Sequence, residues 1–169
     1  RDSEPRPGGS GWRGLECLMW LQFCYRKAMK IVVDTNIFVG ACLGNGAAGR
    51  VIAACLQNRC VPVMGTALLK EYEDVLGRDF LFQTSRLSAT EREELLDIFL
   101  ACCQWTRIYF GWRPNSADAG DDHLVELAIA AGAHAIVTRN QRDLNRMELR
   151  FPQLAILSPE TLLEHLQGD

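Results

Sequence analysis

The sequence predicts an α/β protein in which helices cover both faces of a parallel sheet. Short, continuous runs of apolar and β-branched residues alternate along the chain with longer segments of helical periodicity. Such runs are typical of strands that are buried on both faces, as in parallel sheets. The length of 169 residues fits one domain with a single core.

The first half of the pattern contains two strands and three helices. We expect strands at 30–34 and 61–64, helices at 47–58, 67–76 and 88–103, a loop at 44–46 and a short helix or loop at 80–82. Thr66 is a candidate N-cap for the second helix and Gly77 its stop. Ser88 and Glu91 have the spacing of a capping box at the start of the third.

The second half contains three strands and two helices. We expect strands at 107–110, 135–138 and 154–157, with a polar loop at 111–120. A helix should run from Asp121 or Asp122 to Ala131 and end at Gly132. Ser158 at the N-cap and Pro159 at the first helical position should begin the last helix.

Residues 1–28 differ in composition from the rest. Residues 1–14 are rich in glycine, proline and arginine, which is typical of unstructured chain. The apolar stretch at 15–25 is shorter than the roughly 20 residues of a membrane helix and lacks the small residues of a signal-peptide cleavage site. We therefore divide the chain into an N-terminal extension at 1–28, flexible or non-native, and a domain at 29–169.

This division predicts that the extension is dispensable for folding. A chain that starts at Met29 should melt within a few degrees of the full-length protein, because the first strand begins immediately after that residue. Calorimetry of the two chains checks this. A large loss of cooperativity in the shorter chain would show that residues 15–25 pack on the domain.

Charge and cysteine content exclude some functions. The net charge of −3 argues against binding nucleic acid through a broad basic surface, although it does not exclude an enzyme that holds a phosphodiester on a metal ion. The seven cysteines form no C-x-x-C pair and no zinc-ligand spacing. We expect reduced cysteines packed as small hydrophobic residues in a cytoplasmic protein. A catalytic cysteine is the alternative, with no motif to support it.

Carboxylates mark the expected strand ends and helix starts. In an open parallel sheet the carboxyl ends of the strands meet at one edge, where ligands bind. Acids gathered at that edge repel one another unless a cation neutralises them, and oxygen ligands suit Mg²⁺ or Mn²⁺. The candidates are Asp34 after the first strand, Glu71 in the second helix, Asp121 and Asp122 at a helix start, and Asp143 after the fourth strand.

Each acid also has a simpler interpretation. Asp34 could be a helix cap or a turn residue. Glu71 could be exposed and paired with Arg78 or Lys70, although its spacing places it beside the apolar stripe of its helix. Asp121 and Asp122 could be caps favoured by the helix dipole. Of these two, Asp122 shares the inward face of its helix and is the favoured ligand.

Asp34, Glu71 and Asp122 together resemble the PIN domain, the metal-dependent ribonuclease fold of VapC-like toxins. The resemblance covers about residues 29–166. It rests on five segments in the same order, I-V-V-D-T-N-I-F-V, L-L-K-E-Y-E-D-V-L, D-D-H-L-V-E-L-A-I-A-A-G-A, A-I-V-T-R-N-Q-R-D-L and I-L-S-P-E-T-L-L. It is closest to toxin components of toxin–antitoxin systems.

The resemblance implies a three-layer α/β/α sandwich with about five parallel strands, one or two Mg²⁺ or Mn²⁺ ions and endonucleolytic cleavage of RNA. It also implies an antitoxin partner, a homodimer and no membrane. It carries the first three metal-binding and catalytic acids onto Asp34, Glu71 and Asp122. The family often has an aspartate where this chain has Asn140, so Asp143 becomes the candidate for the fourth acid.

The residues around these acids have expected supporting roles. Thr35, Asn36 and Thr138 should orient the carboxylates. Arg139 could touch the scissile phosphate or simply balance charge. Two divalent ions about 3.5–4 Å apart would activate water, neutralise the phosphate and stabilise the leaving oxygen.

Two further groups have open interpretations. The aromatic residues Trp105, Tyr109, Phe110 and Trp112 could stack on bases, but we favour core packing plus a loop aromatic. The arginines at 107, 113, 139, 142 and 146 could form a basic rim for RNA or an ordinary solvated face.

Two rival functions remain beside the toxin ribonuclease. One is an RNA-processing nuclease without an antitoxin, and the other is a catalytically weak RNA- or protein-binding module, which Asn140 favours. A phosphohydrolase with a nucleophilic Asp34 fits poorly, because no D-x-D-x-T motif follows the first strand.

Overall fold

The computed structural model describes residues 28–44, 46–109, 122–144 and 151–168, and these ranges contain a five-stranded parallel sheet. The strands are β1 (Met29–Val33), β2 (Cys60–Met64), β3 (Gln104–Trp105), β4 (Ala135–Val137) and β5 (Ala155–Leu157). Their order across the sheet is β3-β2-β1-β4-β5, and all neighbouring pairs are parallel.

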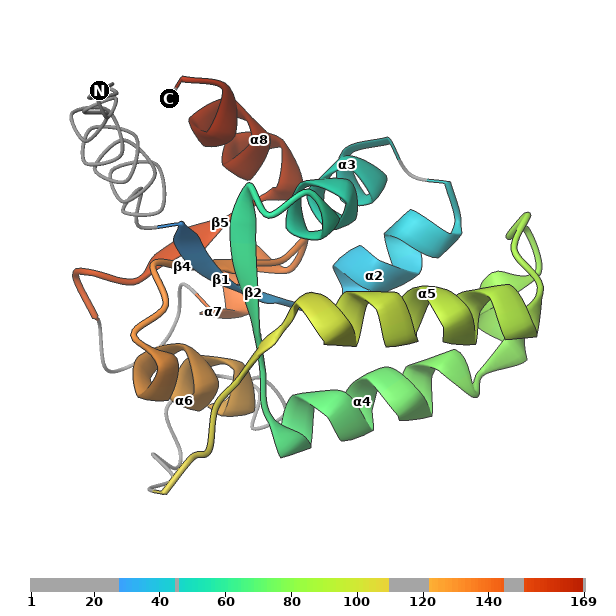
Figure 1. Cartoon of the computed structure of the whole chain (residues 1–169), viewed down its shortest axis with the longest axis horizontal. Coiled ribbons are helices and arrows are strands. Elements are labelled where there is room, and N and C mark those ends of the chain that lie inside the picture. Colours follow the sequence, from blue (N-terminus) through green and yellow to red (C-terminus); the bar gives the residue numbers. More distant parts are fainter. Residues whose placement is uncertain (1–27, 45, 110–121, 145–150, 169) are drawn as a thin grey trace, which may run out of the picture.

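Helices cover both faces of this sheet, as Figure 1 shows. They are α2 (Thr35–Cys42), α3 (Gly46–Leu56), α4 (Thr66–Leu76), α5 (Ala89–Cys102), α6 (Asp122–Ala131), α7 (Gln141–Leu144) and α8 (Pro159–Gln167), with a 3-10 turn η1 at Asp79–Phe82. Helix α6 packs against β1, β2 and β4 on one side, while α3 and α8 pack together on the other. The expected α/β fold is confirmed.

The central strands are buried on both faces. Ile31 and Val32 of β1 and Ala135, Ile136 and Val137 of β4 are all 0% exposed. Their side chains fill the space between the sheet and the helices on both sides, which explains why these runs show no polar alternation. With β1 in the middle, the carboxyl ends of β2, β1 and β4 lie next to one another at one edge of the sheet.

Of the three residues expected as N-caps, Ser88 and Ser158 are confirmed. Ser88 and Glu91 form a reciprocal capping box, with Glu91 N–H donating to Ser88 Oγ at 3.2 Å and Ser88 N–H donating to Glu91 Oε2 at 2.7 Å. Ser158 caps α8 and Pro159 begins it. The expectation for Thr66 was wrong, because Gly65 is the N-cap of α4 and Thr66 is already helical. A Cβ at Gly65 would lie 2.9 Å from Leu127 Cδ1, so close packing against α6 favours glycine there.

Two elements differ from the sequence expectations. Residues 35–42 form α2, which was not expected because Thr35, Ile37, Phe38 and Val39 have low helix propensity. The third strand lies at Gln104–Trp105 rather than 107–110. Its partner β2 ends at Met64, where the chain turns into α4, and the N–H of Thr106 makes the last bond to Met64 O at 2.9 Å. Among the described residues, no strand pairs with the segment beyond Thr106.

The described cysteines are free thiols, as expected. Cys42, Cys55 and Cys60 are buried, whereas Cys102 and Cys103 are half-buried. Burial raises the pKa of Cys42 to about 11 and that of Cys103 to about 12, and thiols so protonated are poor nucleophiles. These two cysteines therefore behave as packing residues.

Within the described ranges, no single helix has the length and apolarity to cross a membrane, and α2 and α3 meet those criteria only as a bent pair.

Candidate functional site

Asp34 lies where β1 ends and α2 begins, and it is 7% exposed. Its Oδ2 accepts hydrogen bonds from Thr138 Oγ1 and from Asn36 Nδ2, each at 2.6 Å. Its Oδ1 accepts weaker ones from Thr35 Oγ1 at 3.3 Å and from the Asn36 N–H at 3.5 Å. Asp34 is therefore the N-cap of α2 as well as an acid at the sheet edge, so the two interpretations are compatible.

The pKa of Asp34 is raised above 3.8, chiefly by burial, with a further increase from the negative charge of Glu71. The hydrogen bonds from Thr138, Asn36 and Thr35 act in the opposite direction and only partly compensate. The folded protein thus holds this proton more tightly than the unfolded chain. Asp34 stabilises the metal-free fold below pH 3.8, and that contribution is lost as pH rises through the raised pKa. A bound cation would remove this penalty at neutral pH.

Glu71 on α4 lies close to Asp34 through a shared partner, because the Thr35 hydroxyl contacts both carboxylates. The distance from Thr35 Oγ1 to Glu71 Oε1 is 2.8 Å. The other oxygen, Oε2, lies 2.6 Å from Nε2 of His123 in the first turn of α6. Burial raises the pKa of Glu71, but the hydrogen bonds from His123 and Thr35 outweigh it, so the net pKa falls below 4.5. Glu71 is therefore an oriented, ionised carboxylate. Arg78 contributes a smaller attraction, but neither Arg78 nor Lys70 forms an ion pair with it.

Two acids occupy the inward face of α6. Asp122 is 2% exposed and Glu126, one turn later, is 7% exposed. The burial of Asp122 agrees with the preference for it as the inward acid. Asp121 lies outside the described residues. Glu126 and His123 were missed from the sequence. Glu126 lies four residues after Asp122, and this spacing could have placed it on the same inward face of the helix. No local sequence pattern marks His123 as a partner of Glu71.

The fourth candidate acid is linked to Asp34 by a chain of hydrogen bonds. Thr138 is 0% exposed, and its hydroxyl donates to Asp34 and accepts from the Asn140 N–H at 3.0 Å. The Asn140 side chain donates from Nδ2 to Asp143 Oδ2 at 2.5 Å. Asp143 lies on α7, the short helix after β4. The structure thus brings Asp143 to the same side of the sheet, with Asn140 as its direct partner.

Asn36 and Arg139 have clear structural roles. Asn36 donates from Nδ2 to Asp34 and to Thr138, and its Oδ1 accepts from the Arg139 N–H at 3.3 Å. The Arg139 guanidinium lies 3.8 Å from Glu160 on α8. Arg139 thus has an acidic neighbour on α8, and its two expected roles both remain open predictions.

The described members of the aromatic group do not pack in the core. Trp105 is 54% exposed and Tyr109 is 80% exposed, so neither is the core residue of the expected combination of core packing and a loop aromatic. Exposed and partly buried residues alternate from 105 to 109, and both aromatic residues occupy exposed positions. Phe110, Trp112, Arg113 and Arg146 lie outside the described residues.

The donor set suits a hard divalent cation. Asp34 and Glu71 offer carboxylate oxygens around one hydroxyl, and each charge disfavours the other in the absence of a cation. Within the described ranges, no three histidine, cysteine or acidic side chains already converge as metal ligands. Mg²⁺ usually keeps several waters and binds through one or two carboxylates. The described residues therefore fit a site in which two carboxylates bind the ion and water completes its coordination.

Removal of the Thr138 hydroxyl should destabilise this network. Thr138→Val keeps the shape of the side chain but removes one of the donors to the buried Asp34 carboxylate and the acceptor of the Asn140 N–H. We expect a loss of about 1–3 kcal/mol in the free energy of unfolding, measured with urea. Thr138→Ser, which keeps the hydroxyl, is the control and should be closer to wild type. Equal stability of the valine variant and wild type would contradict the assigned hydrogen bonds.

The sheet is parallel, and carboxylates lie at the carboxyl ends of its central strands. The protein is therefore an α/β domain with an acidic edge on its sheet. A PIN domain family model matches residues 30–142, more than half of the chain, and the chain belongs to the PIN domain family. Proteins of this family are generally nucleases. No curated protein matches the sequence.

Two solved structures share the fold. VapBC2 from Rickettsia felis, bound to a DNA fragment from its promoter, has a TM-score of 0.51 and 19% identity over 77% of this chain and 98% of that one. PAE2754 from Pyrobaculum aerophilum has a TM-score of 0.53 and 17% identity over 86% of this chain and 95% of that one. At these identities the likeness concerns the fold alone.

Proposed function

We propose that the protein is a metal-dependent endoribonuclease that hydrolyses RNA phosphodiester bonds with Mg²⁺ or Mn²⁺. The observation that carries this proposal is the buried Asp34 carboxylate, which shares the Thr35 hydroxyl with Glu71 at the carboxyl edge of a parallel sheet. Membership of a family of nucleases supports the same reaction class. Burial of Asp34 beside the charge of Glu71 disfavours the ionised form of Asp34, and a bound cation would offset that cost.

Asp34 and Glu71 would hold the ion, with Asp122 and Asp143 as the further acids. The ion supplies an activated water and neutralises the scissile phosphate when it is bound. The chain's own residues prepare the carboxylates for it. Thr138 and Asn36 fix both rotation and position of Asp34, while Thr35 and His123 hold one oxygen each of Glu71. This preorganisation limits the side-chain entropy that metal binding would otherwise cost.

The direct experiment is cleavage of a panel of transfer, ribosomal and messenger RNAs by the full-length protein. Cleavage should appear with Mg²⁺ or Mn²⁺ and disappear with a chelator. Internal products, identified by primer extension, would support an endonuclease. Failure to cleave any RNA in the panel with either ion, together with absence of Mn²⁺ binding, would contradict the proposal.

We further propose that this ribonuclease is a toxin restrained by an antitoxin in the cytoplasm and that it forms a homodimer. The structural likeness to VapBC2 motivates the antitoxin, because that structure contains both components bound to DNA. The rival is an RNA-processing nuclease without an antitoxin. Growth arrest on expression of the wild type, relieved by co-expression of a small protein encoded next to it, supports the toxin. Normal growth with active enzyme favours the rival.

A further inference from the structure

The segment that follows β3 presents three side chains outward in alternation. Trp105 is 54% exposed, Tyr109 is 80% exposed, and Arg107 between them is exposed as well. Thr106 and Ile108 are only partly exposed, and Ile108 packs against the core. This alternation is typical of an extended chain with one face on the protein and one face in solvent. We call Trp105, Arg107 and Tyr109 the aromatic–arginine stripe.

The backbone beneath the stripe is held by the domain. The Thr106 N–H donates to Met64 O at 2.9 Å and so extends the pairing with β2 by one bond. Thr106 O lies 3.4 Å from the position that a Cβ on Gly65 would occupy, so the segment packs tightly against the turn between β2 and α4. The backbone at the start of the stripe is therefore held in place by the domain. Binding a ligand there would not require this backbone to become ordered.

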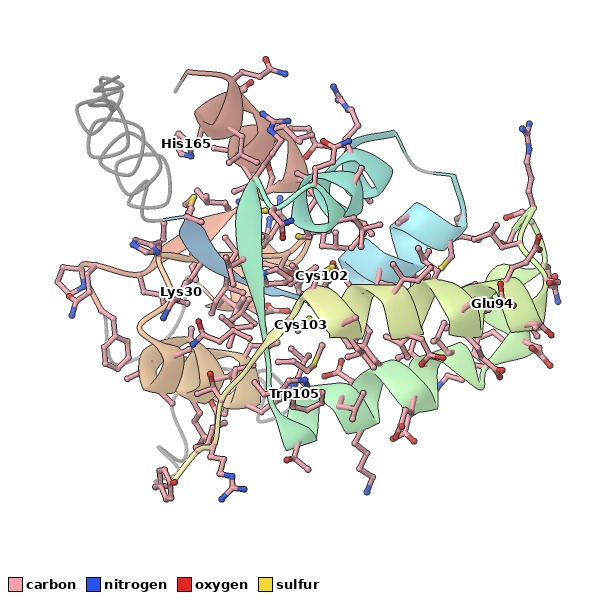
Figure 2. The ribbon with its side chains drawn as sticks, viewed as in Figure 1. Lys30, Glu94, Cys102, Cys103, Trp105 and His165 are labelled. Carbon is pink, nitrogen blue, oxygen red and sulfur yellow. The ribbon has the colours of Figure 1, made fainter. Side chains whose placement is uncertain are left out.

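The stripe begins at the edge of the sheet that carries the candidate site. All strands are parallel, so the carboxyl end of β3 points the same way as that of β1, which ends at Asp34. Figure 2 shows Trp105 on the segment that leaves α5 and passes the carboxyl end of β2. The adjoining Gly65 turn leads into α4, which carries Glu71, and also packs on Leu127 of α6. Two of the helices that contribute acids, α4 and α6, thus meet the base of the stripe.

The chemistry of the stripe matches a single-stranded polyanion. Alternate residues of an extended chain lie about 6.6 Å apart, so the two rings flank the guanidinium at similar spacing. Exposed aromatic rings stack on bases, and an arginine between them can contact a phosphate or a base face. No ion pair joins Arg107 to another described residue, so its charge is available. Without a ligand, the rings of Trp105 and Tyr109 remain largely exposed to water.

We propose that Trp105, Arg107 and Tyr109 form a binding platform for single-stranded RNA that leads the strand to the acidic edge. This inference rests on the proposed ribonuclease function and adds to it the residues that would hold the substrate strand outside the acidic edge. Stacking is tolerant of sequence, so the platform contributes affinity and places no base-specific demand on the substrate.

The test measures fluorescence anisotropy of a labelled single-stranded oligonucleotide with full-length protein that carries Asp34→Asn to prevent cleavage. Trp105→Ala with Tyr109→Ala should weaken binding about 100-fold, since each lost stacking contact is worth about tenfold. Trp105→Phe with Tyr109→Phe keeps both rings and should bind within a few fold of the parent. Phe80→Ala is the matched control, because Phe80 is 66% exposed on η1 and lies outside the stripe.

Arg107→Glu tests the platform without removing a ring. It should weaken binding and make the logarithm of affinity less steeply dependent on salt by about one unit. If the double alanine variant fails to melt cooperatively, this charge reversal decides the question alone. A duplex RNA of the same sequence should bind more weakly than the single strand in every case.

Some outcomes would overturn the platform and leave the enzyme intact. If the alanine pair and Arg107→Glu bind RNA as the parent does, while Asp34-dependent cleavage persists, the platform is wrong and the ribonuclease stands. If these variants instead lower the oligomeric mass in light scattering with RNA binding unchanged, the stripe is a protein interface. Absence of RNA binding by the wild type would overturn both proposals.

Discussion

Asp34→Asn is expected to reduce the rate of RNA cleavage by about 100-fold or more. Asn keeps the size of the side chain but removes the negative charge from the acid that lies between Glu71 and Thr138. Even groups that only support a metal ligand change affinity or activity by about 10–100-fold, so loss of a ligand should exceed that range. Initial rates on one RNA with saturating Mn²⁺ measure the effect.

The control for this variant is Asp97→Asn. Asp97 is an exposed acid on α5, and the same change of one charge there should leave the rate unchanged. A similar loss in both variants would point to net charge. Wild-type activity in Asp34→Asn would show that the chemistry takes place elsewhere on the molecule.

Asp143→Ala is expected to lower Mn²⁺ affinity and cleavage about tenfold or more, and Asn140→Ala to do so by less. Asp143 can offer a charged oxygen to a cation, whereas the Asn140 amide is neutral and already donates to Asp143 at 2.5 Å. Loss of Asn140 would free Asp143 to rotate but would keep its charge. Titration calorimetry and rates on one RNA measure the two effects.

The opposite pattern would identify a three-acid site. If Asn140→Asp raises metal affinity and cleavage while Asp143→Ala changes neither, then Asp143 serves only α7 and the natural fourth position is at residue 140. That result would favour the catalytically weak binding module over the ribonuclease. Glu164→Ala on α8 is a suitable control, because Glu164 is an exposed acid that makes no described contact with the site.

The sheet and most helices could be predicted because their signals are local. The apolar runs of β1 and β4 are buried on both faces, and the caps at Ser88 and Ser158 form within one turn of their helices. Helix α2 was not predicted, since its β-branched and aromatic residues favour a strand locally, and the Asp34 cap together with core packing makes them helical. The position of β3 depends on where its neighbour ends, which is a tertiary fact.

The acids of the candidate site were predictable in part for the same reason. Asp34 follows an apolar strand, and the spacing of Asp122 with its helix gives an inward face. His123 and Glu71 are 52 positions apart in the sequence, and their contact requires α4 and α6 to pack together. No local sequence pattern could therefore predict it. The exposure of Trp105 likewise depends on β3 lying at the edge of the sheet.

The central claim is that Asp34 and Glu71 form the seat of a divalent ion, and titration of Mn²⁺ into metal-free protein tests it most directly. We expect wild type to bind with a measurable heat, Asp34→Asn to lose that binding, and Glu71→Gln to weaken it. Glu73→Gln, an exposed position on the same helix, should bind as wild type. Equal Mn²⁺ affinity in all four proteins would contradict the account.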